Sequence, residues 1–175
     1  MLDETTIHAT VARHLQTATG RHCGACTLCC FVLGVDADNL TKPPDTPCQH
    51  CIASEGCKIY ESRPAPCRGF SCQWLIDQSR YDLWYPLTAR IVISLVCDDD
   101  GSNPYFIFEV DPRCPDRWLQ APYFERISNI ALAVRTTGIG AIVRCGRHWY
   151  ALDDFEWVEV AMPPDFAETG WRLGH

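Results

Sequence analysis

The chain has 175 residues, near the usual size of one domain, and 47% of them are apolar, so a hydrophobic core can form without covalent staples. Its net charge of -7, with no run of Lys or Arg, argues against binding to nucleic-acid backbones or to an anionic membrane surface. The acidic N-terminus has no apolar signal core and the longest apolar stretch, 91–97, is too short to span a bilayer, so we expect a cytoplasmic protein.

The chain begins with a segment, 1–20, that has the pattern of an amphipathic helix. Ile7, Val11 and Leu15 recur one helical turn apart, which predicts a helix over 3–19.

Residues 21–75 have a different character and form a predicted Cys-rich lobe. Nine of the twelve cysteines lie between 21 and 72, together with five prolines and four glycines, and no long periodic segment is present. Such a stretch has little apolar core of its own, so bound metal is expected to hold it together. In a reducing compartment, dense cysteines more often bind metal or carry out redox work than form structural disulfides.

The remainder, 76–175, reads as an antiparallel sheet with a covering helix. A short helix is predicted over 73–80. The apolar runs Ile91–Cys97 and Tyr105–Val110 flank a turn-rich segment and predict a hairpin. Apolar positions spaced three and four residues apart predict a helix from Tyr123 to about Arg135.

A second hairpin follows that helix. The runs 139–145 and 148–152 flank Gly146-Arg147, and Gly in the first turn position favours a type II′ turn. A further strand is predicted at 155–160, and the tail after Pro163-Pro164 is expected to be loose. The predicted fold class is α+β, an irregular metal-binding lobe packed on the sheet and sharing one core with it.

The first cysteine motif is Cys23-x-x-Cys26-x-x-Cys29-Cys30. A C-x-x-C turn brings two thiolates close enough to share one metal. The run also matches the start of a bacterial ferredoxin motif, but Cys30 directly follows Cys29, where that motif requires a spacer. Because neighbouring side chains tend to diverge, the adjacent pair favours two centres, or a cluster with bridging thiolates, over one mononuclear site.

Two blocks carry a family resemblance: CGACTLCC at 23–30 and CKIYESRPAPCRGFSC at 57–72, with Cys48 between them. They resemble the zinc- or iron-chelating family named for its C-x-x-C-x-x-C-C motif, the YkgJ-like cysteine-cluster proteins. Cys51 stands where that family usually has an apolar residue. The resemblance implies eight ligands: Cys23, Cys26, Cys29, Cys30, Cys48, Cys57, Cys67 and Cys72.

Eight thiolates satisfy two tetrahedral sites, which suits zinc or one-iron centres, or they hold one or two iron–sulfur clusters such as [4Fe–4S]. Two zinc sites of this kind carry a net charge of about -4, so nearby positive charge is expected. Arg68, which follows Cys67, is the first choice for that role, together with Arg63. Arg21 and Lys58 are further candidates.

Other chemistry-bearing residues have plainer interpretations. Cys97 and Cys145 end apolar strands and Cys114 lies in a Pro-flanked loop, so they are predicted to be core or spare thiols. His22 and His50 adjoin cysteines and are expected to support or flank the site rather than to bind metal. Tyr60 is expected to pack over the site, while Pro64 fixes a turn.

The sequence favours a metal-binding protein without catalytic residues, whose metal is structural or is held for storage or delivery. In the structural version, the metal-folded lobe docks a protein partner. The alternative is an iron–sulfur redox or electron-transfer protein, such as an oxidoreductase subunit. A third hypothesis, a hydrolase or transferase with a reactive cysteine or an open zinc site, is supported only by His22 and His50.

Overall fold

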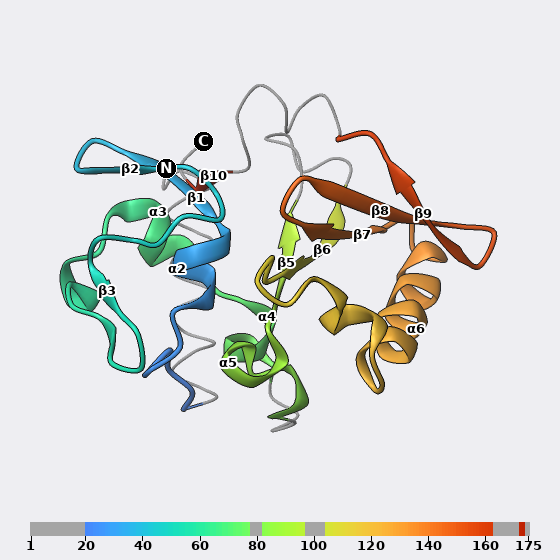
Figure 1. Cartoon of the computed structure of the whole chain (residues 1–175), viewed down its shortest axis with the longest axis horizontal. Helices are drawn as coiled ribbons and strands as arrows, with labels where there is room; N and C mark the ends of the chain where they lie inside the picture. Colours follow the sequence, from blue (N-terminus) through green and yellow to red (C-terminus); the bar gives the residue numbers. More distant parts are fainter. Residues whose placement is uncertain (1–19, 78–81, 97–103, 163–171, 174–175) are drawn as a thin grey trace.

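The computed structural model describes residues 20–77, 82–96, 104–162 and 172–173. The predicted helix at 3–19, the turn at 97–103 and Cys97 lie outside the described residues. The chain is an α+β protein, as predicted. Figure 1 places the Cys-rich lobe beside a five-stranded sheet that is covered by a helix.

Five strands form the larger sheet in the order β5-β6-β7-β8-β9. The predicted first hairpin is confirmed, because β5 and β6 pair antiparallel with Ile91 opposite Val110. The second hairpin, between β7 and β8, is also confirmed, and its Gly146 has the positive φ of 59° that favours glycine. The strands are β5 (Ile91–Val96), β6 (Tyr105–Val110), β7 (Gly140–Cys145), β8 (His148–Asp153) and β9 (Glu156–Val160).

One pairing departs from the prediction of an antiparallel sheet, because β6 and β7 run parallel. The helix α6 (Tyr123–Arg135) joins these strands and carries the chain back to the same end of the sheet, as a parallel connection requires. The bounds of α6 match the predicted helix. Its buried residues Tyr123 and Ile127 pack in one apolar core with residues of the sheet.

Three short helices contact the strands β5 and β6 of this sheet. They are η2 (Asp82–Trp84), α5 (Pro86–Ala89) and η3 (Pro115–Leu119). Trp118 of η3 is buried in the same core and lies 5.6 Å, between ring centroids, from Trp157 of β9. Trp118 and Trp157 of this half therefore serve as core material.

The Cys-rich lobe consists of elements of five residues or fewer, as its loop-rich sequence predicts. They are α2 (Leu28–Val32), β1 (Gly34–Ala37), β2 (Leu40–Lys42), β3 (Cys51–Ile52), β4 (Gly56–Cys57), η1 (Tyr60–Ser62), α3 (Ala65–Gly69) and α4 (Gln73–Ile76). α4 ends at Ile76, and residues 78–80 of the helix predicted over 73–80 lie outside the described residues.

Of the tail after Pro163-Pro164, expected to be loose, only 172–173 belong to the described residues. There β10 (Arg172–Leu173) pairs in parallel with β1, so that β1 lies between β10 and β2. A backbone pairing of two residues carries no apolar pattern, and for that reason the sequence did not predict it.

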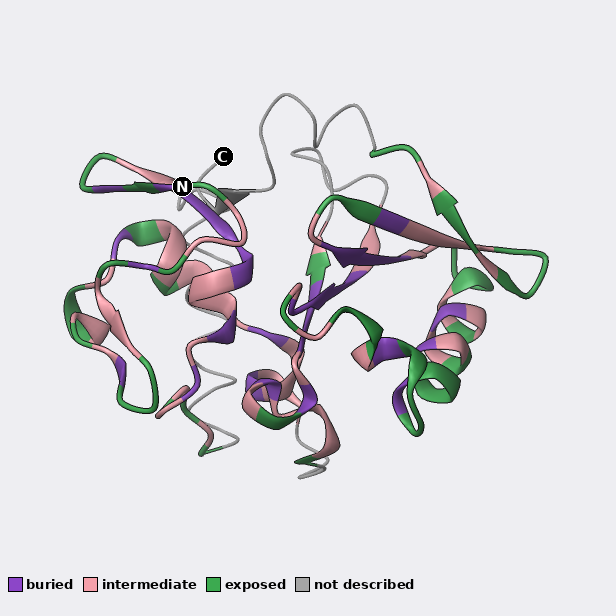
Figure 2. Ribbon diagram, viewed as in Figure 1, coloured by how far each residue is buried: buried purple, intermediate pink, exposed green. Residues whose placement is uncertain are grey.

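Apolar contacts join the lobe to the sheet. Val92 of β5 is fully buried in a cluster with Cys26, Leu28 and Leu75 of the lobe. Figure 2 shows buried residues both along the sheet and inside the lobe. Within the described residues, no helix is long and apolar enough to cross a membrane.

A buried ion-pair network also crosses the junction. The guanidinium of Arg144, on β7, pairs with the buried Glu109 of β6 and with Asp45 of the lobe. It also donates to the carbonyl of Val32, at 2.8 Å, at the end of α2. One side chain of the sheet thereby positions the helix that bears Cys29 and Cys30.

Candidate metal centre

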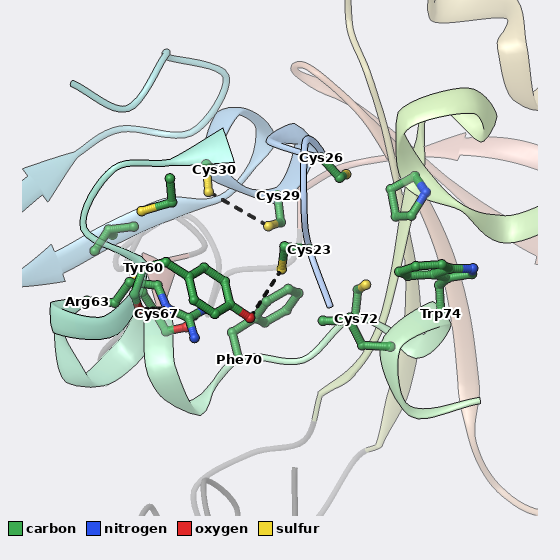
Figure 3. Close-up of a pocket in the computed structure, with 14 residues that line it drawn as sticks. Cys23, Cys26, Cys29, Cys30, Tyr60, Arg63, Cys67, Phe70, Cys72 and Trp74 are labelled. Carbon is green, nitrogen blue, oxygen red and sulfur yellow. Dashed lines mark hydrogen bonds between the residues drawn. The ribbon is translucent and has the colours of Figure 1, made fainter. Parts of the chain in front are cut away.

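Seven cysteines line one cavity in the Cys-rich lobe. They come from the first C-x-x-C turn, α2, β4, α3 and the residue before α4, and they share the wall with aromatic and aliphatic side chains (Figure 3). The lining cysteines are Cys23, Cys26, Cys29, Cys30, Cys57, Cys67 and Cys72. All seven belong to the set that the family resemblance implies, and the eighth, Cys48, is buried nearby without lining this cavity.

The first C-x-x-C segment forms the expected tight turn. The backbone N–H of Cys26 donates to the carbonyl of Cys23 at 2.9 Å, and Gly24 within the turn has a φ of +52°. α2 begins two residues after Cys26 and places Cys29 and Cys30 side by side. Their sulfurs lie 4.0 Å apart, so the expectation that these adjacent side chains diverge is wrong.

The thiols fall into two groups by the apolar residues that they contact. The first sulfur group packs around Leu28 and Leu75 and consists of Cys23, Cys26, Cys29 and Cys72. The second packs around Val35 and Leu40 and contains Cys30, Cys48, Cys51 and Cys67. Cys57 pairs with Cys51 across the β3–β4 hairpin, and we count it in the second sulfur group. The adjacent pair Cys29–Cys30 therefore links the two groups.

Gly56 allows the β3–β4 hairpin to approach the first turn closely. A Cβ atom built on Gly56 would lie 2.2 Å from the carbonyl oxygen of Gly24, and Gly56 has a φ of +98°. Both the close approach and the backbone conformation therefore require glycine at this position.

We expect Gly56→Ala to destabilise the lobe by more than the roughly 1–2 kcal/mol that the left-handed conformation alone costs a residue with a Cβ. The excess arises because the methyl group pushes the hairpin away from Gly24. Gly138→Ala is the matched control, since Gly138 has a φ of +80° but no atom within 4 Å of its built Cβ. Urea unfolding of both variants measures the difference, and equal losses would contradict a steric role for Gly56.

Tyr60 and Arg63 form a polar cover on one side of the cavity. The Tyr60 hydroxyl points at the sulfur of Cys23, 4.0 Å away, as Figure 3 shows, and the Arg63 guanidinium stacks on the Tyr60 ring at 3.8 Å. Arg63 also donates to the carbonyls of Tyr60 at 2.8 Å and of Cys67 at 3.3 Å. The predicted packing of Tyr60 over the site agrees with this geometry.

The structure places Arg63, and not Arg68, beside the thiols. Arg68 lies in the last turn of α3 with an exposed side chain and is not among the residues that line the cavity. Its position directly after Cys67 suggested proximity, but successive helical side chains point in different directions. Lys58 is likewise exposed, and Arg21 donates to backbone carbonyls of Trp74 and Asp77 instead of reaching the sulfurs.

Lys42 is a buried cation that the sequence analysis missed. Its ammonium group, on β2, donates to the carbonyls of Phe31, Leu33 and Pro43. Burial lowers the pKa of Lys42, whereas the nearby thiols of Cys48 and Cys30 act in the opposite direction. Lys42 lies on the same buried face of the short strand β2 as Leu40. A three-residue strand is too short for its sequence to predict this burial.

Burial raises the pKa of several of the lobe thiols. It raises the pKa of Cys26 and of Cys67 to about 11 and that of Cys72 to about 12. Cys30 is the exception, because hydrogen bonds from Cys29 and Cys51, with further help from Lys42, hold its pKa well below the usual value. Buried thiols of this kind become thiolates when a bound cation replaces the proton.

The positions of the remaining described candidates are as follows. His22 is exposed, and His50 lies with its Nε2 3.3 Å from the side-chain nitrogen of Gln49. Cys145 is buried in the apolar core of the sheet, while Cys114 is partly exposed at the start of η3. The described cysteines are all free thiols.

The donor set can be compared with what a metal requires. Four thiolates on a tetrahedral zinc, with bonds of about 2.3 Å, stand about 3.8 Å apart, and the Cys29–Cys30 separation of 4.0 Å is near that value. In the described part of the chain, however, no group of three or more His, Cys, Asp or Glu side chains is arranged so that it could hold a metal as it stands. The chemistry of the donors fits zinc or iron, and the thiol side chains would have to close around the ion.

Comparisons with protein-family models, with curated proteins and with solved structures found nothing that matches this chain.

Proposed function

We propose that the protein binds zinc or iron through the thiolates of its Cys-rich lobe, without catalysing a reaction. The ligands would come from the eight cysteines that the family resemblance implies. The observation that carries this proposal is the gathering of seven of them, from five separate segments, around one largely apolar cavity. Cys29 and Cys30, adjacent on α2, lie at the junction of the two sulfur groups.

The metal would supply positive charge and cross-links to a lobe whose helices and strands are too short to be stable alone. The residues around it complement this role. Arg63 and Lys42 contribute cationic charge near Cys23 and Cys30, and the Tyr60 hydroxyl points at a sulfur. A site closed by four thiolates has no open position for water or substrate, which favours structural, storage or delivery roles over hydrolysis.

A reducing compartment suits this proposal, because the free thiols of the lobe stay available for metal there. The cytoplasm is the compartment that we propose. In the structural version of the role, the metal-folded lobe docks a protein partner.

An iron–sulfur redox role is the second candidate, supported by one observation. The first sulfur group contains the whole C-x-x-C-x-x-C run together with Cys72, which makes four thiols around one apolar cluster. Four cysteine thiolates are the usual complement of a [4Fe–4S] cluster.

The test is metal analysis combined with a visible absorption spectrum of the full chain purified without oxygen. We expect about two zinc ions per chain and no visible colour if closed thiolate sites are present. Iron with acid-labile sulfide and broad visible absorption would support the redox candidate instead. A chain that contains neither metal and takes up none after reduction would overturn the proposed function.

A further inference from the structure

Cys48 and Cys51 form a second C-x-x-C turn with the same backbone hydrogen bond as the first. The N–H of Cys51 donates to the carbonyl of Cys48 at 3.0 Å, and the N–H of Cys26 donates to the carbonyl of Cys23 at 2.9 Å. Turns of this kind present two thiols toward one metal. Cys51 therefore occupies the second position of a metal-binding turn, although the family resemblance leaves it out.

The hairpin that follows this turn orients Cys51. β3 and β4 pair antiparallel with Cys51 directly opposite Cys57, and residues opposite one another project from the same face of a ribbon. The N–H of Lys58 donates to the carbonyl of His50 at 2.8 Å, which continues the pairing beyond the two strands. The side chain of Cys51 thus shares a face with Cys57, a cysteine that lines the cavity.

Cys51 also lies against the other thiols of the second sulfur group. It packs with Cys48, Cys30 and Cys67 around Val35 and Leu40. Cys51 and Cys30 belong to the same packed cluster. The half-buried Cys51 therefore lies among cysteines that could bind the same metal.

We propose that Cys51 is a ninth metal ligand, and that the second metal of the lobe is bound by the Cys48–Cys51 turn together with other thiols of the second sulfur group. This inference rests on the proposed function. The Cys48–Cys51 turn then supplies two of the four thiolates that a tetrahedral site uses, and the other two come from Cys30, Cys57 and Cys67.

The test is alkylation of the metal-loaded and chelator-treated full chain, with each labelled cysteine identified by peptide mass spectrometry. Bound metal is expected to protect both Cys51 and Cys67 from the alkylating reagent. Chelation is expected to restore the labelling of both. Cys114 is the control, because it is partly exposed and lies outside the lobe, so its labelling should not depend on metal. Labelling of Cys51 at the same rate with and without metal would overturn the proposal.

Two variants separate ligation from packing. Cys51→Ser and Cys51→Val should both weaken binding of the second metal by about tenfold or more, a loss of at least roughly 1.4 kcal/mol. If Cys51 had a purely apolar role, Cys51→Val would keep full affinity for the second metal. That result would overturn the proposal. A wild-type chain that binds no metal would instead refute the proposed function itself, so the two failures are distinguishable.

Discussion

Cys72→Ser is expected to lose metal from the Cys-rich lobe and to unfold it, whereas Cys145→Ser is expected to leave the metal content unchanged. The two thiols are matched in burial, with 6% and 7% of their surfaces exposed. Replacing either buried thiol by a hydroxyl costs about 1–3 kcal/mol if the hydroxyl finds no partner. Only Cys72 lies in the first sulfur group, while Cys145 lies in the core of the sheet.

Cys72→Ser is expected to lose more stability than Cys145→Ser because metal binding and folding are linked. Structural zinc sites of four ligands contribute about 10–16 kcal/mol of apparent binding free energy, so a missing ligand removes far more stability than a buried hydroxyl does. Metal content by mass spectrometry and unfolding by circular dichroism measure the two effects. Full metal occupancy in Cys72→Ser, or equal metal loss in both variants, would show that the first sulfur group does not bind metal.

Most of the sheet could be predicted from sequence because its signals are local. Continuous apolar runs specified β5 and β6, the three- and four-residue spacing specified α6, and Gly146 marked the turn between β7 and β8. The parallel pairing of β6 with β7 was missed, although a helix between two apolar runs is the usual sign of a parallel connection. The β1–β10 pair could not be predicted, because two residues give no periodic pattern.

The C-x-x-C spacing anticipated the tight turn at Cys23–Cys26, because such a turn is a local structure. The wider set of thiols around the cavity was anticipated by the family resemblance and not by spacing. The cations around the thiols depend on tertiary contacts and were harder to predict. Arg68 adjoins Cys67 in sequence but is exposed, whereas Lys42 lies in another segment and is buried near Cys30 and Cys48. Proximity in sequence was therefore a poor guide to which charges compensate the thiols.

Arg144→Met is expected to destabilise the protein, by up to about 3–5 kcal/mol at a pH where Glu109 must be ionised, because it removes the partner of that buried carboxyl group. The substitution also removes the hydrogen bonds to Asp45 and to the Val32 carbonyl that connect the sheet to α2. Arg147→Met is the control, since Arg147 is exposed three residues further along the chain. Chemical unfolding at pH 7 measures both variants, and losses of similar size would contradict the role assigned to this network.

The pH dependence of that loss identifies the unpaired carboxylate as its cause. Burial raises the pKa of Glu109 from 4.5 to about 7 even in the presence of Arg144, so the folded protein binds a proton more tightly there than the unfolded chain does. Stability from this group is complete below pH 4.5 and falls as the pH rises toward 7. Without Arg144 the pKa of Glu109 rises further, so the deficit of Arg144→Met should grow with pH. In the double variant with Glu109→Gln, the loss of stability should no longer grow with pH. If the loss in Arg144→Met alone stays constant from pH 5 to 8, Glu109 is not its source.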